Sequence, residues 1–261
     1  MAEEHPLKPF YSVLVLAFFC SLLVSGAAVG LRPFQEANKQ LDQRKNILRA
    51  AGIYSAEIPV DKQFEKVETR IVDLVSGEFV SEQVLAPGEY NQRKAAFTEE
   101  YGRQLSPGTD KAGLSRIEKY SLVYLIKDGQ NIQQVVLPVR GKGLWSTMFA
   151  YVALDADLNT IQGISFYEHG ETPGLGGEIE NPKWQASWSG KKVYDKSDTV
   201  RFSVLKGEST ATGEEAAFEV DGLSGATMTS MGVNDLMHFW FGEHGFKPFI
   251  DRIQAQGGFN G

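Results

Sequence analysis

The most pronounced hydrophobic segment of the chain is an uncharged run near its N-terminus. Residues 10–31, FYSVLVLAFFCSLLVSGAAVGL, contain no acidic or basic side chain. A helix rises about 1.5 Å per residue, so this run is about 33 Å long, enough to cross the hydrocarbon core of a bilayer. A cleaved signal peptide is the alternative, because residues 25–28 are small, but its apolar region is typically only about 7 to 15 residues long. The pattern therefore predicts a retained transmembrane helix at residues 10–31, after a short tail at residues 1–9.

Two further segments place apolar residues at helical spacing. Pro33 can open a helix directly after the membrane run, and Asp61 is a suitable N-cap for a second helix that ends near residues 76–77. Apolar stripes of this kind usually pack in a core. We therefore expect a stalk helix and linker at residues 32–56, followed by a globular domain at residues 57–261.

From near the middle of the chain, β-branched and aromatic residues become frequent in short runs, which is typical of strands. One hairpin is predicted around Asp128-Gly129 and a second around residues 155–157. Residues 199–207 predict a further strand. Residues 79–115 are polar and rich in turn residues, and we assign no chemistry to them.

Helical spacing of apolar residues returns in the last part of the chain. Residues 228–241 predict a helix that Thr227 or Thr229 can cap, and residues 246–254 predict a short final helix. Antiparallel-looking strands framed by helices at both ends predict an α+β fold rather than a βαβ winding. We expect one N-terminal transmembrane helix and then a domain with a largely antiparallel or mixed β-sheet framed by helices.

Charge balance and cysteine content limit the classes of function. The chain has 33 acidic and 26 basic residues and a formal net charge of −7, which disfavours binding to the phosphate backbone of nucleic acids. Cys20 is the only cysteine, so no disulfide forms within the chain and no cysteine-based zinc or iron–sulfur site can be assembled. With only four histidines besides, we expect no metal centre, and any redox chemistry has to come from an organic cofactor.

Three stretches combine small residues with groups that can bind a cofactor. Residues 141–148, GKGLWSTM, offer a tryptophan and two hydroxyls, and residues 169–177, HGETPGLGG, form a glycine-dense loop after a strand. A planar ring system needs a flat side chain beside it, close backbone approach, and donors for its polar edge. Residues 221–230, DGLSGATMTS, run into a helix, whose N-terminus favours a phosphate. Together the stretches predict a phosphorylated aromatic cofactor.

The sequence DGLSGATMTS closely resembles the flavinylation motif Asp-x-x-[Ser/Thr]-Gly-Ala-[Thr/Ser] of a flavoprotein family. That family comprises the C subunit of the sodium-translocating NADH:quinone reductase and the related G subunit of the Rnf electron-transport complex. The resemblance extends over nearly the whole chain. The HGETPGLGG and GKGLWST loops resemble the quinone reductase subunit, and the Rnf subunit is the alternative. In this family a separate flavin transferase attaches FMN through its phosphate to the last hydroxyl residue of the motif, here Thr227.

The resemblance implies roles for individual residues. Thr227 would be the covalent attachment point of FMN, with Thr229 as a second candidate two positions away. The transferase would recognise Thr227 in the context of Asp221, Ser224, Gly225 and Ala226. The flavin pocket would be lined by Trp145, Ser146, Thr147, Glu171, Thr172, Gly174, Leu175 and Gly176. No residue of the chain itself is expected to be catalytic.

The resemblance also implies partners and a location. The chain would relay electrons within a Na⁺-pumping NADH:ubiquinone oxidoreductase, with little or no NADH oxidation of its own; its partners would be the other subunits and membrane lipid. The family places it in the bacterial inner membrane, as a single-pass protein with its main domain in the periplasm. The positive-inside rule favours the opposite orientation, although long domains cross membranes largely regardless of charge. The basic residues that count against the family orientation are Arg32, Lys39, Arg44, Lys45 and Arg49.

Two alternatives come from other classes of protein. The run Gly-Leu-Ser-Gly-Ala at residues 222–226 differs by one residue from the nucleophile elbow Gly-x-Ser-x-Gly, which would make the chain a membrane-anchored serine hydrolase with Ser224 as nucleophile and a histidine as base. In the other, the loop only caps a helix, and the chain is a membrane-anchored ligand-binding or scaffold domain without a cofactor.

If the chain is a flavoprotein, the negative charge of Glu171 near the ring would lower the reduction potential of the flavin, and Glu171→Gln would raise it.

Overall fold

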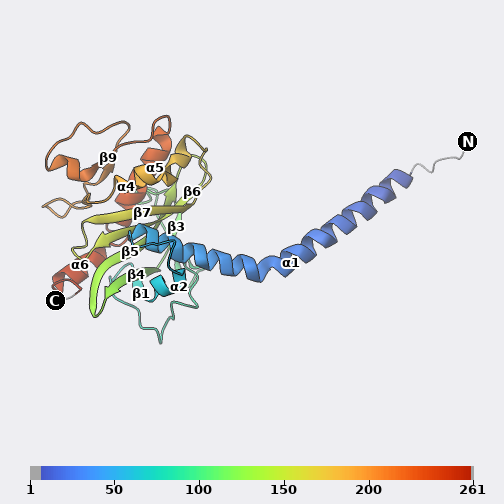
Figure 1. The fold of residues 1–261 in the computed structure, drawn as a ribbon, viewed down its shortest axis with the longest axis horizontal. Helices are drawn as coiled ribbons and strands as arrows, with labels where there is room; N and C mark the ends of the chain where they lie inside the picture. Colours follow the sequence, from blue (N-terminus) through green and yellow to red (C-terminus); the bar gives the residue numbers. More distant parts are fainter. Residues whose placement is uncertain (1–6, 260–261) are drawn as a thin grey trace, which may run out of the picture. The chain divides into compact units, whose positions relative to one another are not determined.

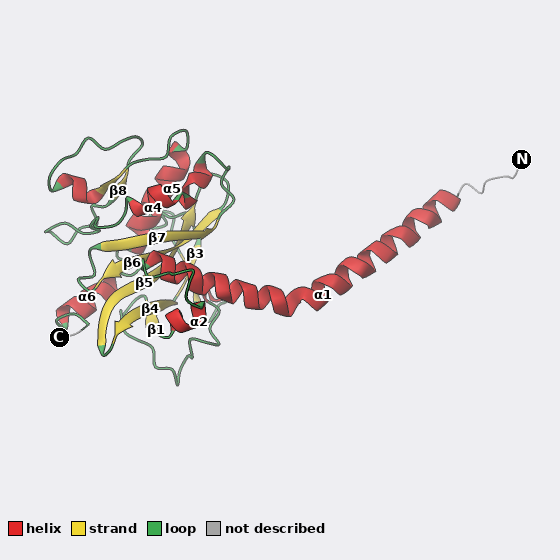
Figure 2. Ribbon diagram, viewed as in Figure 1, coloured by secondary structure: helices red, strands yellow, loops and turns green. Residues whose placement is uncertain are grey.

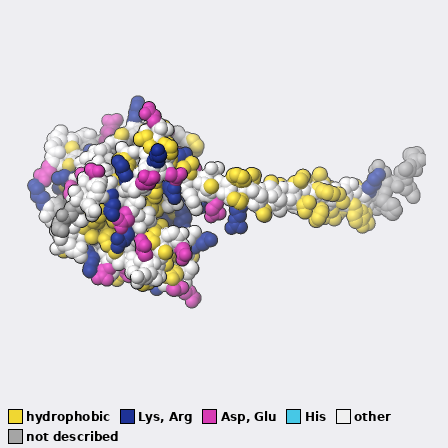
Figure 3. Space-filling view, turned by 60° about the horizontal axis from the view of Figure 1, so that its bottom comes forward, with side chains coloured by type: hydrophobic (Ala, Val, Ile, Leu, Met, Phe, Trp, Pro, Cys, Tyr) yellow, Lys and Arg dark blue, Asp and Glu magenta, His cyan; other side chains and the backbone are white. Residues whose placement is uncertain are grey.

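The computed structural model describes residues 7–259, and the chain divides into two compact units, one up to Gln43 and one from Arg44 onward (Figure 1). A helix, α1 (Lys8–Ala50), contains the whole uncharged run. It is the one helix among the described residues that is long and apolar enough to cross a membrane. Apolar side chains are exposed along this run, whereas acidic and basic side chains are intermixed over the second unit (Figure 3). The surface of the run therefore suits contact with lipid.

The prediction that a separate helix begins at Pro33 is wrong, because α1 continues through this residue. Proline has no amide hydrogen and removes one helical hydrogen bond, but its fixed φ angle matches that of a helix. Good helix formers on both sides carry the helix through. One helix, α1, covers residues 10–31 and most of the predicted stalk at residues 32–56. It stays a prediction that the first part lies in the membrane and the second outside it. Of the expected tail at residues 1–9, residues 1–6 lie outside the described residues.

A five-stranded antiparallel sheet forms the centre of the second unit (Figure 2). Both predicted hairpins are confirmed: β4 turns into β5 at Gly129, whose φ is +63°, and β6 turns into β7 after Asp155. Each neighbouring pair of strands is antiparallel. The strands are, in spatial order, β1 (Val67–Asp73), β4 (Tyr120–Asp128), β5 (Asn131–Lys142), β6 (Thr147–Asp155) and β7 (Ile161–Glu168).

Alternation along the strands sends side chains into two hydrophobic cores, one on each face of the sheet. On β6, Met148 and Val152 belong to the larger core and Tyr151 to the smaller. The larger core includes side chains of α5 (Thr227–Trp240) and α6 (Lys247–Ala255), and the smaller includes the last turn of α1. This arrangement confirms the α+β fold and the predicted final helix.

Short elements complete the second unit. Two of them, β2 and β3, form a small antiparallel pair, and β8 and β9 form a small parallel pair. These elements are α2 (Val60–Phe64), α3 (Gln92–Ala95), β2 (Gly102–Gln104), β3 (Arg116–Glu118), the 3₁₀ helix η1 (Gly176–Glu180), α4 (Pro182–Ala186), β8 (Ser203–Val204), the 3₁₀ helix η2 (Glu215–Phe218) and β9 (Glu219–Val220).

The helix predicted from Asp61 to residues 76–77 is wrong beyond its first turn, and Asp61 is not its N-cap, because α2 begins at Val60 with Pro59 as the N-cap. The short helix α2 ends at Phe64, and the chain then forms strand β1. Val67 and Ile71 are four positions apart, a spacing that lies on one face both of a helix and of a strand. The β-branched residues of this segment and its antiparallel pairing with β4 decide in favour of the strand.

The strand predicted at residues 199–207 is wrong for most of its length. The two residues of β8 pair in parallel with β9, and Val200 forms one isolated antiparallel bridge with Tyr194. Asp195 folds the preceding segment into a turn: its Oδ1 accepts hydrogen bonds from the N–H groups of Ser197 at 2.9 Å and Thr199 at 3.2 Å. Phe202 is fully buried in the larger core. Side-chain packing therefore fixes this segment in place of a strand ladder.

Candidate functional site

The structure brings the three candidate stretches together where β5 ends and where β6 and α5 begin. We call them the first loop (residues 143–146, the turn between β5 and β6), the second loop (residues 169–177, after β7) and the third loop (residues 221–226, before α5). The N–H of Gly170 donates to Ser146 Oγ at 2.6 Å, which joins the second loop to the first.

Glu171 in the second loop connects the first loop to α5. Its carboxylate accepts hydrogen bonds from three consecutive N–H groups of the first loop and from one hydroxyl of α5. The donors are Leu144 N at 3.2 Å, Trp145 N at 2.9 Å, Ser146 N at 3.3 Å and Thr229 Oγ1 at 2.6 Å. Burial of the side chain would raise the pKa of Glu171, but these hydrogen bonds outweigh burial and hold the pKa below its ordinary value. The carboxylate is therefore ionised at neutral pH.

The second loop is fixed by its own backbone and touches the third loop. The carbonyl of Thr172 accepts from the N–H groups of Leu175 at 3.1 Å and Gly177 at 2.9 Å, and Gly174 has a φ of +75°. The Leu175 side chain lies against Gly225 of the third loop, where a Cβ would come within 3.1 Å of Leu175 Cδ2. All three loops therefore contribute to one surface.

Thr227 and Thr229 differ in their surroundings although they share the first turn of α5. Thr227 is the first helical residue and is exposed, whereas Thr229 is 1% exposed and donates to Glu171. The prediction that a threonine caps this helix is wrong, because the N-cap is Ala226, which has no side-chain acceptor. The N–H groups of the first turn thus have no side-chain cap, an arrangement that suits an anionic phosphate. Ser224, in the third loop, is also exposed.

Asp221 and Thr147 lie at the margins of the site. Asp221 Oδ1 accepts from the N–H of Ser209 at 2.7 Å, and its carbonyl accepts from Trp184 Nε1 at 2.8 Å. These contacts fix the third loop to residues outside the other two loops. Thr147 pairs with Lys142 in the β5–β6 register and closes the base of the first loop.

Exposed apolar side chains of the first loop, the second loop and the start of α5 make up what we call the apolar rim, and the sequence predicts only part of it. Trp145 and Leu175 were expected there, but Leu144, Met228 and Met231 were not. Met231 is four positions after Thr227 and shares its face of α5, a signal that the sequence does contain. Exposed apolar side chains beside small residues and an uncapped helix N-terminus fit a phosphorylated aromatic ring. The rim consists of Leu144, Trp145, Leu175, Met228 and Met231, which are 48%, 69%, 45%, 57% and 40% exposed.

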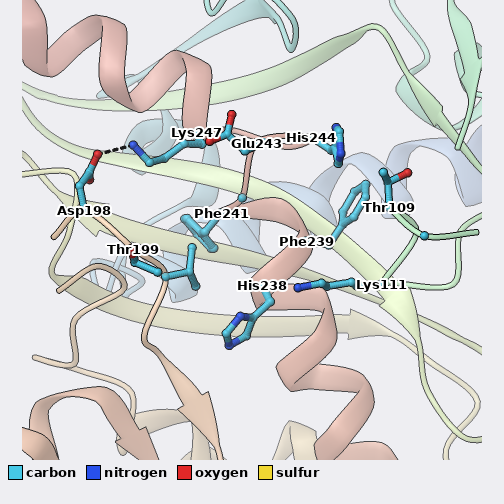
Figure 4. A pocket seen from close by; sticks show the side chains of 13 residues that line it. Thr109, Lys111, Asp198, Thr199, His238, Phe239, Phe241, Glu243, His244 and Lys247 are labelled. Carbon is cyan, nitrogen blue, oxygen red and sulfur yellow. Dashed lines mark hydrogen bonds and ion pairs between the residues drawn. The ribbon is translucent and has the colours of Figure 1, made fainter. Parts of the chain in front are cut away.

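A separate cavity of about 410 Å³ lies at the other end of α5 (Figure 4). The His238 ring, in its wall, is 2.9 Å from the carbonyl oxygen of Phe202, and Lys247 forms an ion pair with Asp198. Lys111 points toward His238 from the opposite wall (Figure 4). The cavity shares no lining residue with the three loops, so we assign it no part in the site.

The serine hydrolase alternative finds no support in these positions. Ser224 precedes α5, whereas His238 lies near its end, about 16 Å along the helix axis from the first turn. His244 lies beyond α5 and lines the same cavity. His169 accepts a hydrogen bond on Nδ1 from the N–H of Glu171 at 3.1 Å. Among the described residues, no histidine is hydrogen-bonded to Ser224 as a base would be.

Comparison with known proteins places the site in a family. A family model described as FMN-binding domain matches residues 143–242, which include α5, all three loops and the motif. Over 95% of its length the chain is 45% identical to the C subunit of the Na(+)-translocating NADH-quinone reductase of Vibrio parahaemolyticus, and the match covers 95% of that protein. The chain belongs to this family of C subunits. It is also 40% identical to the corresponding protein of Pseudomonas aeruginosa, with 97% of each chain covered.

Solved structures of the family share the fold. The crystal structure of NqrC from Shewanella oneidensis matches with a TM-score of 0.76 and 33% sequence identity, covering 84% of this chain and 99% of that one. The resemblance inferred from the motif is thereby confirmed, and the names of these relatives favour the quinone reductase subunit over the Rnf subunit. The FMN-binding domain match also counts against a scaffold without a cofactor.

Proposed function

We propose that the chain is the membrane-anchored, FMN-carrying electron-transfer subunit of a Na⁺-translocating NADH-quinone reductase, with FMN joined through its phosphate to Thr227. The family supports the subunit and the flavin. The observation that carries the attachment point is the contrast between the two threonines of α5. Thr227 is exposed at the first turn, whereas Thr229 is buried with its hydroxyl donated to Glu171.

The position of Thr227 suits a phosphoester. The new bond joins Thr227 Oγ1 to phosphorus, while the hydroxyl loses its proton and the flavin donor loses its leaving group from the same phosphorus. The phosphate then lies beside the N–H groups of the first turn of α5, where the helix dipole favours negative charge. A flavin transferase would need to reach the hydroxyl, and the exposed Ser224 and Gly225 beside it leave that approach open.

The surroundings of Thr227 suit a redox ring that exchanges electrons with other subunits. FMN supplies the electron chemistry, and the protein supplies position and environment. The apolar rim would contact the ring, with Trp145 providing a flat surface beside it. Because the rim is open to the surface, electrons can pass directly to and from redox centres of partner subunits. The same proposal places α1 among the lipids of the bacterial inner membrane and the second unit on its periplasmic side.

The test is to map the modification on the full-length chain, expressed with and without a flavin transferase. We expect flavin fluorescence that persists on a denaturing gel only with the transferase, and mass spectrometry should locate FMN on the peptide that contains Thr227. Thr227→Val should remove the modification completely. Thr229→Val is the matched control, because it makes the same substitution two residues away, and it should keep the flavin.

Two results would refute the attachment. One is a colourless wild-type chain of unmodified mass after expression with the transferase. The other is covalent flavin that persists in Thr227→Val.

A further inference from the structure

The Glu171 carboxylate has more partners than a residue that only lines a pocket. It is 4% exposed and accepts four hydrogen bonds, three from the first loop and one from Thr229. Two glycines leave space for it. A Cβ at Gly143 would lie 2.6 Å from Glu171 Oε1, and a Cβ at Gly176 would lie 2.4 Å from Thr229 Oγ1 and 2.9 Å from Glu171 Oε2. The carboxylate thus occupies a closely fitted position between three segments.

We propose that Glu171 is a positioning residue that holds the Trp145 turn and the first turn of α5 in a fixed relation, so that the ring contact and the attachment hydroxyl are presented together. This inference rests on the proposed function for its flavin readout only. Thr227 and Thr229 are two residues apart on α5, about 200° around the helix, so anchoring the inward hydroxyl of Thr229 fixes the outward direction of Thr227.

The identity of the side chain matters because of its acceptors. A carboxylate has two oxygens that accept only, which matches four donors. Glutamine at this position keeps one accepting oxygen for the N–H groups of Trp145 and Ser146. Its amide can donate to the hydroxyl of Thr229, but it cannot accept from the N–H of Leu144, so that one hydrogen bond is lost. Alanine keeps neither interaction. If Glu171 acts by positioning, Glu171→Gln should keep most of the order of the first loop that Glu171→Ala removes. If only its charge matters, the two substitutions should have the same effect.

The first measurement needs no flavin. Full-length chain expressed without a transferase is compared by amide hydrogen exchange as wild type, Glu171→Ala, Glu171→Gln and Thr229→Val. We expect the N–H groups of residues 144–146 to be protected in the wild type and to exchange about ten-fold faster or more in Glu171→Ala. In Glu171→Gln, Trp145 and Ser146 should keep most of their protection, whereas Leu144 should lose it. Thr229→Val should speed exchange of the N–H of Ser230, which donates to the carbonyl of Ala226 at 3.0 Å at the start of α5, while the first loop keeps its three bonds to Glu171.

Glu118→Gln is the control for general loss of stability. Glu118 is a second fully buried carboxylate, and its partners, Arg140 and Gln92, lie outside the three loops. We expect this variant to unfold more easily while exchange at residues 144–146 under native conditions stays as in the wild type. If it speeds exchange there as much as Glu171→Ala does, the effect is general and the proposal fails.

The second measurement uses the same variants after flavin attachment. We expect visible circular dichroism and flavin fluorescence to change in Glu171→Ala and to stay near those of the wild type in Glu171→Gln and Glu118→Gln. The proposal is overturned if residues 144–146 exchange in the wild type as fast as an open turn. It is also overturned if Glu171→Ala and Glu171→Gln shift the reduction potential of the flavin equally while their amide exchange and visible circular dichroism stay as in the wild type. If Glu171→Ala does not fold, Glu171→Gln and Thr229→Val decide by exchange. If the wild-type chain carries no flavin after expression with the transferase, the proposed function is contradicted. The positioning role is then still decided by the exchange measurement, which needs no flavin.

Discussion

At the scale of single residues, the site depends on which side of one helical turn a hydroxyl occupies. The sequence favours Thr227, the last residue of the motif, for attachment of FMN and leaves Thr229, two positions beyond it, as a second candidate. The structure separates them, because Glu171 reaches α5 from the second loop and binds only the inward one. That contact spans 58 positions of sequence. Glu171 could be predicted as a site residue, but its role as an acceptor beneath the first loop could not.

The Glu171–Thr229 hydrogen bond predicts a pH-dependent loss of stability in Thr229→Val. Burial raises the pKa of Glu171 and the hydrogen bonds lower it further than burial raises it, so the folded pKa lies below the ordinary value of 4.5. Such a group stabilises the fold above its ordinary pKa, and this contribution is lost as the pH falls through the folded pKa. Thr229→Val should lower the free energy of unfolding at pH 7 by about 1.5 to 3 kcal/mol, and the difference should shrink in acid.

Urea denaturation at pH 7 and at about pH 3 measures this difference. Thr227→Val makes the same substitution at an exposed position of the same helical turn, and we expect it to change stability by less than about 0.5 kcal/mol at either pH. A Thr229→Val deficit that is equally large in acid would show that packing of the side chain, not its bond to the ionised carboxylate, is what stabilises the fold.

At the scale of elements, the sequence predicts what local residues determine. The β4–β5 and β6–β7 hairpins follow from turn residues beside β-branched runs, and both form. The predictions of a helix at residues 61–77 and of a strand at residues 199–207 are wrong for most of their length because distant parts of the chain determine these structures. Pairing with β4 makes most of the first segment a strand, and burial of Phe202 fixes the second. Pairing partners are not encoded within the segment itself, so no local pattern could have separated these outcomes.

Close packing of α5 against the end of β5 predicts that Gly232→Ala destabilises the fold. A Cβ at Gly232 would lie 2.5 Å from the carbonyl oxygen of Lys142 and 3.3 Å from Gly143 Cα, which are backbone atoms that cannot rotate away. Alanine in place of a helical glycine normally gains about 1 kcal/mol, but overpacking of this kind costs about 1 to 3 kcal/mol. We therefore expect a lower midpoint of thermal unfolding.

Gly30→Ala is the matched control, since Gly30 is also helical but has nothing within 4 Å of the added Cβ. It should leave the unfolding of the second unit unchanged. Stabilisation by Gly232→Ala would mean that α5 can shift away from β5 at no cost, and the first loop would then not be fixed by this helix.

At the scale of the whole molecule, two physical rules disagree about orientation. Five basic residues follow the uncharged run of α1, at positions 32, 39, 44, 45 and 49, against one before it at Lys8. Counted over short flanks, this excess retains the second unit in the cytoplasm, but the rule loses force for long domains, and here more than 200 residues follow the helix. Relay of electrons at the outer surface, as proposed from the family, requires the second unit to be translocated.

The lone cysteine makes this conflict testable by labelling. In a Cys20→Ser chain that carries Ser189→Cys, an exposed position of the second unit, a membrane-impermeant maleimide should label intact spheroplasts as fully as lysed ones. The paired control, Cys20→Ser with Ala2→Cys ahead of the uncharged run, should be labelled only after lysis. The reverse pattern would place the second unit in the cytoplasm. The flanking charges would then set the topology, and the redox partners of Thr227-bound FMN would have to lie on the inner side of the membrane.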